Sequence, residues 1–191
     1  MVTPSEMDQQ LLESARVHLN KFLEHTAQKL PKNGLMLEIG AQGRTKVQEC
    51  FKTWDIKSFD LIADHQPDYV GDLTLFNEAI PDDFFDAIAC MEVLEHTVDP
   101  FAAIKEIRRI SKDGADLLVS APLNFRIHGP LPDCWRFTEY GWKVLLKDFE
   151  IVKMDIMETP SRPLFPVKYN IWARVDKSKN IDPRNIKFER K

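Results

Sequence analysis

The chain has 191 residues, the size of one domain or of one domain with an arm. Hydrophobic residues make up 43% and charged residues 29%, and this ordinary globular composition excludes a collagen-like, mucin-like or disordered chain. The 26 basic and 30 acidic side chains give a net charge of −4, so no broad basic face for nucleic acid is expected.

The first predicted element is an amphipathic helix over residues 4–29. Residues 3–6, with the sequence Thr-Pro-Ser-Glu, form a capping-box pattern with proline at the first helical position. Apolar residues then recur at helical spacing. This apolar stripe predicts packing against the rest of the domain, and a lid over a ligand site is the alternative.

Strands and helices alternate through most of the remaining chain. Short apolar runs stopped by glycine, aspartate or proline predict buried strands, and amphipathic stretches predict helices between them. The predicted strands are residues 35–39, 58–63, 68–70, 85–90 and 117–121, and the predicted helices are residues 47–54, 99–114 and a segment after Thr138. Two alternating stretches, 152–156 and 167–175, come last without a helix between them, which indicates an antiparallel pair at a sheet edge.

This order of elements predicts an α/β fold. We expect a Rossmann-like, doubly wound, mostly parallel seven-stranded sheet with helices on both faces and an antiparallel C-terminal strand pair. A single domain over residues 1–191 is expected, with a helical arm at 1–30, a core at 35–176 and a polar tail at 177–191.

Targeting and metal signals are weak in this sequence. The N-terminus lacks a basic segment followed by an apolar one, and no apolar run is long enough to span a bilayer. We therefore expect a cytoplasmic protein without a membrane partner. Three scattered cysteines are too few for a disulfide framework or a zinc site, and no metal is expected.

Polar or glycine residues follow each of the five predicted parallel strands, at the sheet edge where open α/β folds bind ligands. The turn from Gly40 to Gly43 follows the first strand directly after Glu38. Asp64 follows the second predicted strand, where a carboxylate can accept hydrogen bonds from both hydroxyls of a ribose; Asp60 is the alternative. The glycine pattern is incomplete for a dinucleotide fingerprint, so a nicotinamide-dependent oxidoreductase is disfavoured.

Taken in this order, the motifs resemble the class I S-adenosylmethionine-dependent methyltransferases, in particular the branch with type 11 methyltransferase domains. The resemblance covers residues 35 to about 150. It rests on the glycine turn at 37–43, the acid Asp64, the segments 71–73 and 91–96, and a loop over 127–138 that some members share. S-adenosylmethionine is therefore the implied cofactor.

The resemblance also implies which residues contact this cofactor. Glu38, Gly40, Ala41, Gln42 and Gly43 would lie against its methionine part, Asp64 would hold the ribose, Asp72 and Leu73 would border the adenine, and Met91 and Glu92 would lie near the sulfonium. Gln42 and Arg44 replace glycines that are usual in this turn. A module that keeps the fold without turnover is therefore the alternative function.

Methyl transfer requires alignment and, for an alcohol or amine, removal of a proton. His128 is the candidate base, because histidine titrates near neutral pH. Asp133 is a candidate acceptor for a substrate hydroxyl, and Arg136 a candidate for binding a substrate carboxylate or phosphate. Alternatively, residues 135–137 fix this loop to the following helix and Asp133 pairs with Arg136. We interpret His96 as a structural residue.

The expected acceptor is a small molecule or a sugar, methylated on oxygen or nitrogen. The chain has no insertion long enough for a separate substrate domain. Recognition is therefore expected from the N-terminal helix and from the loops at 122–137 and 158–167. The sequence does not indicate an oligomeric state.

Overall fold

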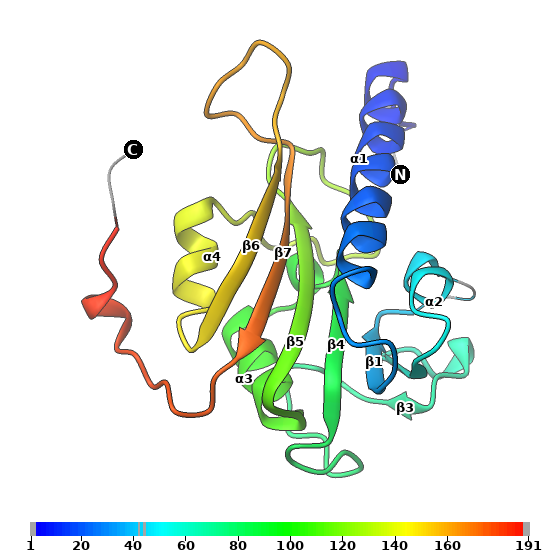
Figure 1. Cartoon of the computed structure of the whole chain (residues 1–191). Coiled ribbons are helices and arrows are strands. Elements are labelled where there is room, and N and C mark those ends of the chain that lie inside the picture. The colour runs from blue at the N-terminus through cyan, green and yellow to red at the C-terminus, as the bar shows by residue number, and fades with distance from the viewer. Residues whose placement is uncertain (1–2, 42, 44, 189–191) are drawn as a thin grey trace.

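Figure 1 shows the computed structural model of the chain, which describes residues 3–41, 43 and 45–188. Its centre is a seven-stranded sheet with the order β3-β2-β1-β4-β5-β7-β6. The strands are β1 (Leu35–Ile39), β2 (Asp55–Asp60), β3 (Tyr69–Val70), β4 (Phe85–Met91), β5 (Ser111–Pro122), β6 (Phe149–Met157) and β7 (Lys168–Val175). Strands β1 to β5 pair in parallel, whereas β7 runs antiparallel to both β5 and β6. The predicted fold class is confirmed.

Helices cover both faces of the sheet. They are α1 (Glu6–Ala27), α2 (Lys46–Cys50), α3 (Pro100–Ile110) and α4 (Glu139–Leu145), with short 3₁₀ helices η1 (Ala63–His65), η2 (Leu94–His96) and η3 (Pro183–Asn185). Figure 1 shows α1 and α2 on one side of the central strands and α3 and α4 on the other. The sheet is thus doubly wound, with an apolar layer on each face.

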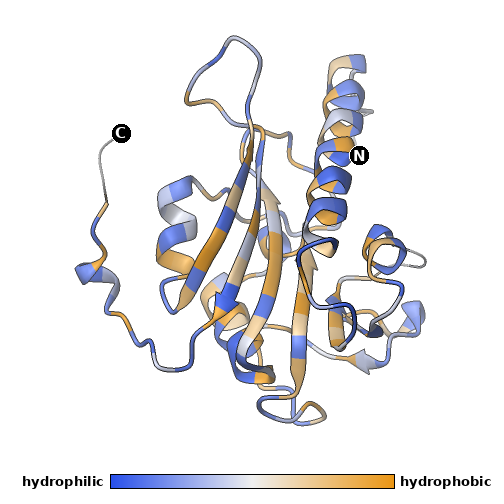
Figure 2. Cartoon of the chain, viewed as in Figure 1, coloured by the Kyte–Doolittle hydropathy of each residue, from blue (hydrophilic) through white to orange (hydrophobic). Residues whose placement is uncertain are grey.

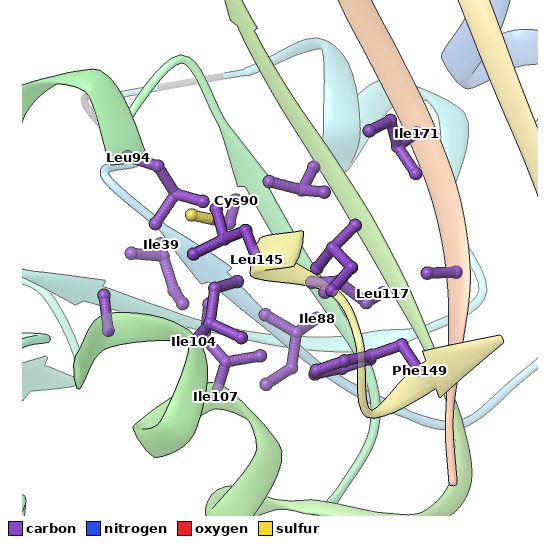
Figure 3. Close-up of a cluster of buried hydrophobic side chains, with 14 of the residues drawn as sticks. Ile39, Ile88, Cys90, Leu94, Ile104, Ile107, Leu117, Leu145, Phe149 and Ile171 are labelled. Carbon is purple, nitrogen blue, oxygen red and sulfur yellow. The ribbon is translucent and has the colours of Figure 1, made fainter. Parts of the chain in front are cut away.

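The two apolar layers use alternate residues of the central strands. Figure 3 shows Ile88 of β4 and Leu117 of β5 packed with Ile104 and Ile107 of α3. The opposite layer joins Met36, Ala89 and Leu118 to side chains of α1 and α2. Because both faces are buried, the central strands are nearly continuously hydrophobic, as the colours of Figure 2 show.

Helix α1 begins at a capping box, two residues later than predicted. Ser5 is the N-cap: its hydroxyl accepts a hydrogen bond from the Asp8 backbone at 3.1 Å, and the Asp8 carboxylate accepts one from the Ser5 backbone at 2.9 Å. Phe22 and Leu23 are buried in the layer beside α2. Neither α1 nor any other helix of the described residues is long and apolar enough to cross a bilayer.

Three predicted boundaries are wrong, and each error has a local cause. The strand predicted at 58–63 is β2 at 55–60, because parallel pairing with β1 fixes its register and leaves Leu61 68% exposed. The helix predicted at 47–54 ends at Cys50. Phe51 and Trp54 are still buried, but they lie in the turn that follows the helix. The helix predicted to end at Gly114 stops at Ile110, where β5 begins at once.

The first residues of the tail that follows β7 contact the C-terminal end of α3. The Arg108 guanidinium donates to the backbone carbonyls of Asp176, Lys177 and Lys179 at 2.9–3.1 Å. Ile181 continues this attachment, because its backbone donates to the Asp148 carboxylate at 2.8 Å. The first part of the predicted polar tail is therefore bound to the domain.

Candidate active site

The carboxyl ends of the parallel strands meet at one edge of the sheet. Backbone hydrogen bonds join the segments there: Gly40 donates to Phe59 at 2.8 Å, and Glu92 donates to Ser120 at 3.1 Å. The glycine turn, the end of β2 and the segments after β4 and β5 are thereby held beside one another. Nearly all the residues that sequence analysis singled out lie on these segments.

The turn after β1 requires glycine at its first position. Gly40 has a φ of +77°, and a Cβ built on it would lie 2.6 Å from Cγ2 of Val93. Gly43 also has a positive φ, of +74°, but a Cβ there would meet nothing within 4 Å. Ala41 between them is buried, and Gln42, with Arg44, lies outside the described residues.

We expect Gly40→Ala to lower the free energy of unfolding by about 1–3 kcal/mol, because it adds both backbone strain and a clash with Val93. Urea denaturation measures this loss. Gly43→Ala is the matched control, since it introduces the same backbone strain but its Cβ would contact no neighbouring atom. Equal losses in the two variants would show that the contact with Val93 contributes nothing.

Glu38 lies at the end of β1 with its carboxylate turned into the domain. Burial raises the pKa of this carboxyl, opposed by hydrogen bonds to Thr45 and Gln48. The Gln48 amide donates to its Oε2 at 3.3 Å. Glu38 is thus an acceptor fixed behind the glycine turn.

Asp60, not Asp64, occupies the end of β2. It is buried, its Oδ1 accepts from the Ile62 backbone at 2.8 Å, and its Oδ2 lies 3.1 Å from Nδ1 of His65. Asp64 is exposed on η1, beyond the strand. The expectation that Asp64 ends this strand is wrong, because β2 stops three residues earlier than predicted.

Two other predicted cofactor residues follow β3. The Asp72 Oδ1 accepts from the backbone and the hydroxyl of Thr74 at 2.8 and 2.7 Å, which fixes a turn. Leu73 is buried in the layer covered by α3. Their predicted position beside an adenine stays a prediction.

Met91 ends β4, and Glu92 follows it in a strained conformation with a φ of +57°. The Glu92 Oε1 accepts from the Ser120 hydroxyl at 2.6 Å and lies 2.9 Å from Nζ of Lys168. Lys168 is only 2% exposed. Backbone strain at a strand end, here beside an ion pair whose lysine is buried, is a feature of functional sites.

Lys168 is a site residue that the sequence pattern does not predict. Its position in β7, alternating with apolar neighbours, predicts a solvent-facing side chain. The antiparallel pairing of β5 and β7 instead sets Lys168 opposite Pro122, at the same sheet edge as Glu92.

The three predicted catalytic residues lie together in the loop after β5. His128 contacts the Asp133 carboxylate through its backbone N–H at 2.9 Å and its Nδ1 at 3.1 Å. Arg136 donates to both oxygens of Asp133, at 2.5 and 2.7 Å. The Asp133 side chain is fully buried, and the Arg136 guanidinium holds the pKa of its carboxyl well below the usual value. The alternative pairing of Asp133 with Arg136 is confirmed.

The same loop is fixed to the segment after β4. The backbone N–H groups of Cys134 and Trp135 donate to the Glu95 carbonyl at 2.7 and 3.2 Å. The Trp135 indole donates to the Thr97 carbonyl at 2.9 Å, and its ring stacks on Phe137. The alternative expected for residues 135–137 was attachment to the following helix, and Phe137 does contact Trp142 of α4, with ring centroids 4.9 Å apart.

Glu95 and His96 of η2 face His128 across this attachment. The Glu95 side chain is fully buried, and neither carboxylate oxygen has a hydrogen-bond partner among the described residues. Burial, followed by the nearby Glu92 carboxylate, raises its pKa well above the usual value. The Nε2 atoms of His96 and His128 lie 3.9 and 4.0 Å from Glu95 Oε1. His96 thus lies between Glu95 and the Pro132 carbonyl, which is 3.0 Å from its Nδ1, and its structural role stays a prediction.

A pocket of about 510 Å³ opens beside the loop that carries Asp133 and Arg136. It is lined by Asp8 and Leu11 of α1, by residues 123–127, by Asp133, Cys134 and Arg136, and by Phe165. These are the three elements from which acceptor recognition was expected. A larger cavity of about 750 Å³ lies between α3, the turn after α4 and the C-terminal tail, and none of the strand-end residues described above lines it.

The strand order, with β7 antiparallel between β5 and β6, is that of the Rossmann-like methyltransferase fold. A family model described as a methyltransferase domain matches residues 11–150, more than half of the chain. The chain therefore belongs to this family, and it is an S-adenosylmethionine-dependent methyltransferase. The comparison with curated proteins gives no match.

Several solved structures share the fold. A methyltransferase from Methanosarcina mazei is 18% identical, with a TM-score of 0.62, and the match covers 78% of this chain and 95% of that one. A putative methyltransferase from Bacillus halodurans is also 18% identical, at 82% and 98% coverage and a TM-score of 0.59. The trans-methyltransferase CalH, in complex with S-adenosylhomocysteine, is 18% identical, at 83% and 55% coverage and a TM-score of 0.64.

Proposed function

We propose that this enzyme transfers the methyl group of S-adenosylmethionine to an oxygen or nitrogen of a small-molecule or sugar acceptor. The observation that carries this proposal is the 510 Å³ pocket, which is lined by Asp133, the residue whose carboxylate contacts His128. The pocket has the size of a small-ligand site. When bound, the cofactor supplies an electrophilic methyl group on a sulfonium.

The chain's own residues fit such a cofactor at the sheet edge. The turn at Gly40 presents backbone where a side chain would clash, so a ligand can approach closely. In the proposal Asp60 takes the ribose role first expected of Asp64, because it ends β2 next to the glycine turn. Its carboxylate has lone pairs beyond those used by Ile62 and His65.

The remaining cofactor residues follow from their positions. Glu38 and the turn would face the methionine part, Asp72 and Leu73 the adenine, and Met91 and Glu92 the sulfonium. The pair of Glu92 and Lys168 supports this last position, because it fixes the strained residue after β4.

In the proposal His128 removes the acceptor's proton. Its Nδ1 faces a carboxylate, which accepts hydrogen bonds and so holds the ring proton on that nitrogen. The lone pair is then on Nε2, as general-base catalysis requires. Asp133 and Arg136 act as positioning residues, because Asp133 binds His128 and the Arg136 guanidinium is occupied by Asp133 and by the carbonyls of Trp135 and Arg126.

The test has two steps. Calorimetric titration with S-adenosylhomocysteine measures cofactor binding, and an acceptor panel of sugars, phenols and amines with radiolabelled methyl donor measures transfer. We expect His128→Asn to retain cofactor affinity and to lower the rate about 10²- to 10⁴-fold. The exposed His25→Asn is the matched control.

Two results would contradict the proposal. Saturable cofactor binding without transfer to any acceptor would favour a module that has lost turnover. Absence of cofactor binding by folded protein would overturn the assignment of the sheet edge as the cofactor site.

A further inference from the structure

We propose that Glu95, His96 and His128 form a binding site for a divalent transition-metal ion. One ligand atom from each residue lies within 4.8 Å of the other two. Two imidazoles and one carboxylate are a donor set that binds Mn²⁺, Fe²⁺, Co²⁺ and Zn²⁺. The site is built from the segment after β4 and the loop after β5.

The protonation of the two histidines prepares them for a cation. The Nδ1 of His96 lies 3.0 Å from the Pro132 carbonyl, and the Nδ1 of His128 lies 3.1 Å from the Asp133 carboxylate. Both partners only accept hydrogen bonds, so each ring carries its proton on Nδ1 and presents a lone pair on Nε2. Metal-binding histidines are oriented in this way, with the other nitrogen donating to a carbonyl or carboxylate.

Glu95 gives a second, independent observation. Its carboxylate is fully buried, and among the described residues neither oxygen accepts a hydrogen bond. The groups facing its Oε1 are the two Nε2 atoms at 3.9 and 4.0 Å, which are themselves acceptors in these tautomers. Acceptors that converge in a buried space need either a proton or a metal cation between them, and we propose the metal cation.

The distances leave room for an ion. Ligands that bind one ion at about 2.0–2.2 Å lie roughly 3 Å apart in adjacent positions. The two Glu95–histidine pairs would therefore close by about 1 Å, and the two histidine nitrogens, which lie within 4.8 Å of each other, by up to about 2 Å. Side-chain rotation supplies such a movement. The Glu95 carbonyl already accepts from Cys134 and Trp135 and so holds both ligand segments together.

Three protein ligands leave coordination positions open for water or substrate. The Glu95 side chain is buried, whereas the His96 and His128 side chains are 12% and 25% exposed. The open coordination positions of the ion would therefore be on the solvent side, near the two histidines. Resting on the proposed function, this places an oxygen of the acceptor on the ion. The ion would then lower the pKa of the acceptor hydroxyl. The released proton would pass to water, because the Nε2 lone pair of His128, which is the base in the metal-free proposal, would be bound to the ion.

The test uses the full chain without an affinity tag. Co²⁺ titration followed by visible absorption measures metal binding, and calorimetry with S-adenosylhomocysteine is run on the same samples. We expect one Co²⁺ per chain, and at least tenfold weaker binding in His96→Asn and His128→Asn. The exposed His25→Asn, which removes a histidine far from the cluster along the chain, should bind Co²⁺ like the wild type.

Glu95→Gln adds a third variant, in which the same shape carries no charge, and it should also lose Co²⁺. If this buried substitution prevents folding, as circular dichroism would show, the two histidine variants decide. Absence of Co²⁺ binding, or binding that the histidine variants retain, would overturn the metal site. With cofactor binding intact, that result would leave His128 as the base. Co²⁺ binding that the histidine variants lose, in a protein that does not bind S-adenosylhomocysteine, would support the metal site and contradict the proposed function.

Discussion

Replacing Asp60 with asparagine is expected to weaken the binding of S-adenosylhomocysteine about 10- to 100-fold. A hydrogen bond to a charged group contributes about 1.5–3 kcal/mol, which corresponds to this range. Asparagine keeps the shape of the side chain and an oxygen that accepts from the Ile62 backbone, so the end of β2 should remain intact. Isothermal titration of wild type and variant measures the change.

Asp64→Asn is the matched control, because Asp64 carries the same charge four residues later on the exposed helix η1. We expect its affinity to stay within twofold of the wild type. The reverse pattern, with a large loss in Asp64→Asn and none in Asp60→Asn, would return the ribose role to the residue that the sequence first suggested. Equal and small effects would remove an acidic residue from ribose binding altogether.

Sequence patterns predicted the fold well where one physical constraint dominates. Strand β4 and the helix capped by Asp99 follow from apolar periodicity and a side-chain cap, both of which are local. The end of β2 could not be read in the same way. Leu61 and Ile62 extend the apolar run of the strand, but both are exposed, because parallel pairing with β1 already fixes the strand at Asp55–Asp60.

The site shows the same division. The loop with His128, Asp133 and Arg136 was found because it follows the fifth predicted strand and resembles a loop of the family, and its hydrogen bonds are local. Lys168 was missed, because its partner Glu92 is 76 positions away and only the pairing of β5 with β7 brings the two together. The buried state of Glu95 also depends on this tertiary packing, which a helix N-terminal acid does not reveal by itself.

Asp133→Asn is expected to lower the free energy of unfolding at pH 7 by about 3 kcal/mol, because it leaves the Arg136 guanidinium without its charged partner inside the loop. The buried Asp133 carboxylate now accepts from Arg136 at 2.5 and 2.7 Å and from the His128 backbone at 2.9 Å. Asparagine has one acceptor oxygen in place of two. Urea denaturation measures the change, with the exposed Asp64→Asn as a control that should match the wild type.

The effect of Asp133→Asn should depend on pH in one direction. The pKa of Asp133 is lower in the folded protein than its ordinary value of 3.8, so its ionised form stabilises the fold. This contribution is complete well above pH 3.8 and is lost as the pH falls through that value toward the folded pKa. The difference in unfolding free energy between wild type and variant should therefore be larger at pH 7 than at pH 3. The acids far from Asp133 titrate equally in both proteins, so the difference reports Asp133 with its partners Arg136 and His128 and with Glu95, whose pKa the Asp133 carboxylate helps to raise. A difference that stays constant down to pH 3 would show that the variant acts through packing rather than through the lost charge.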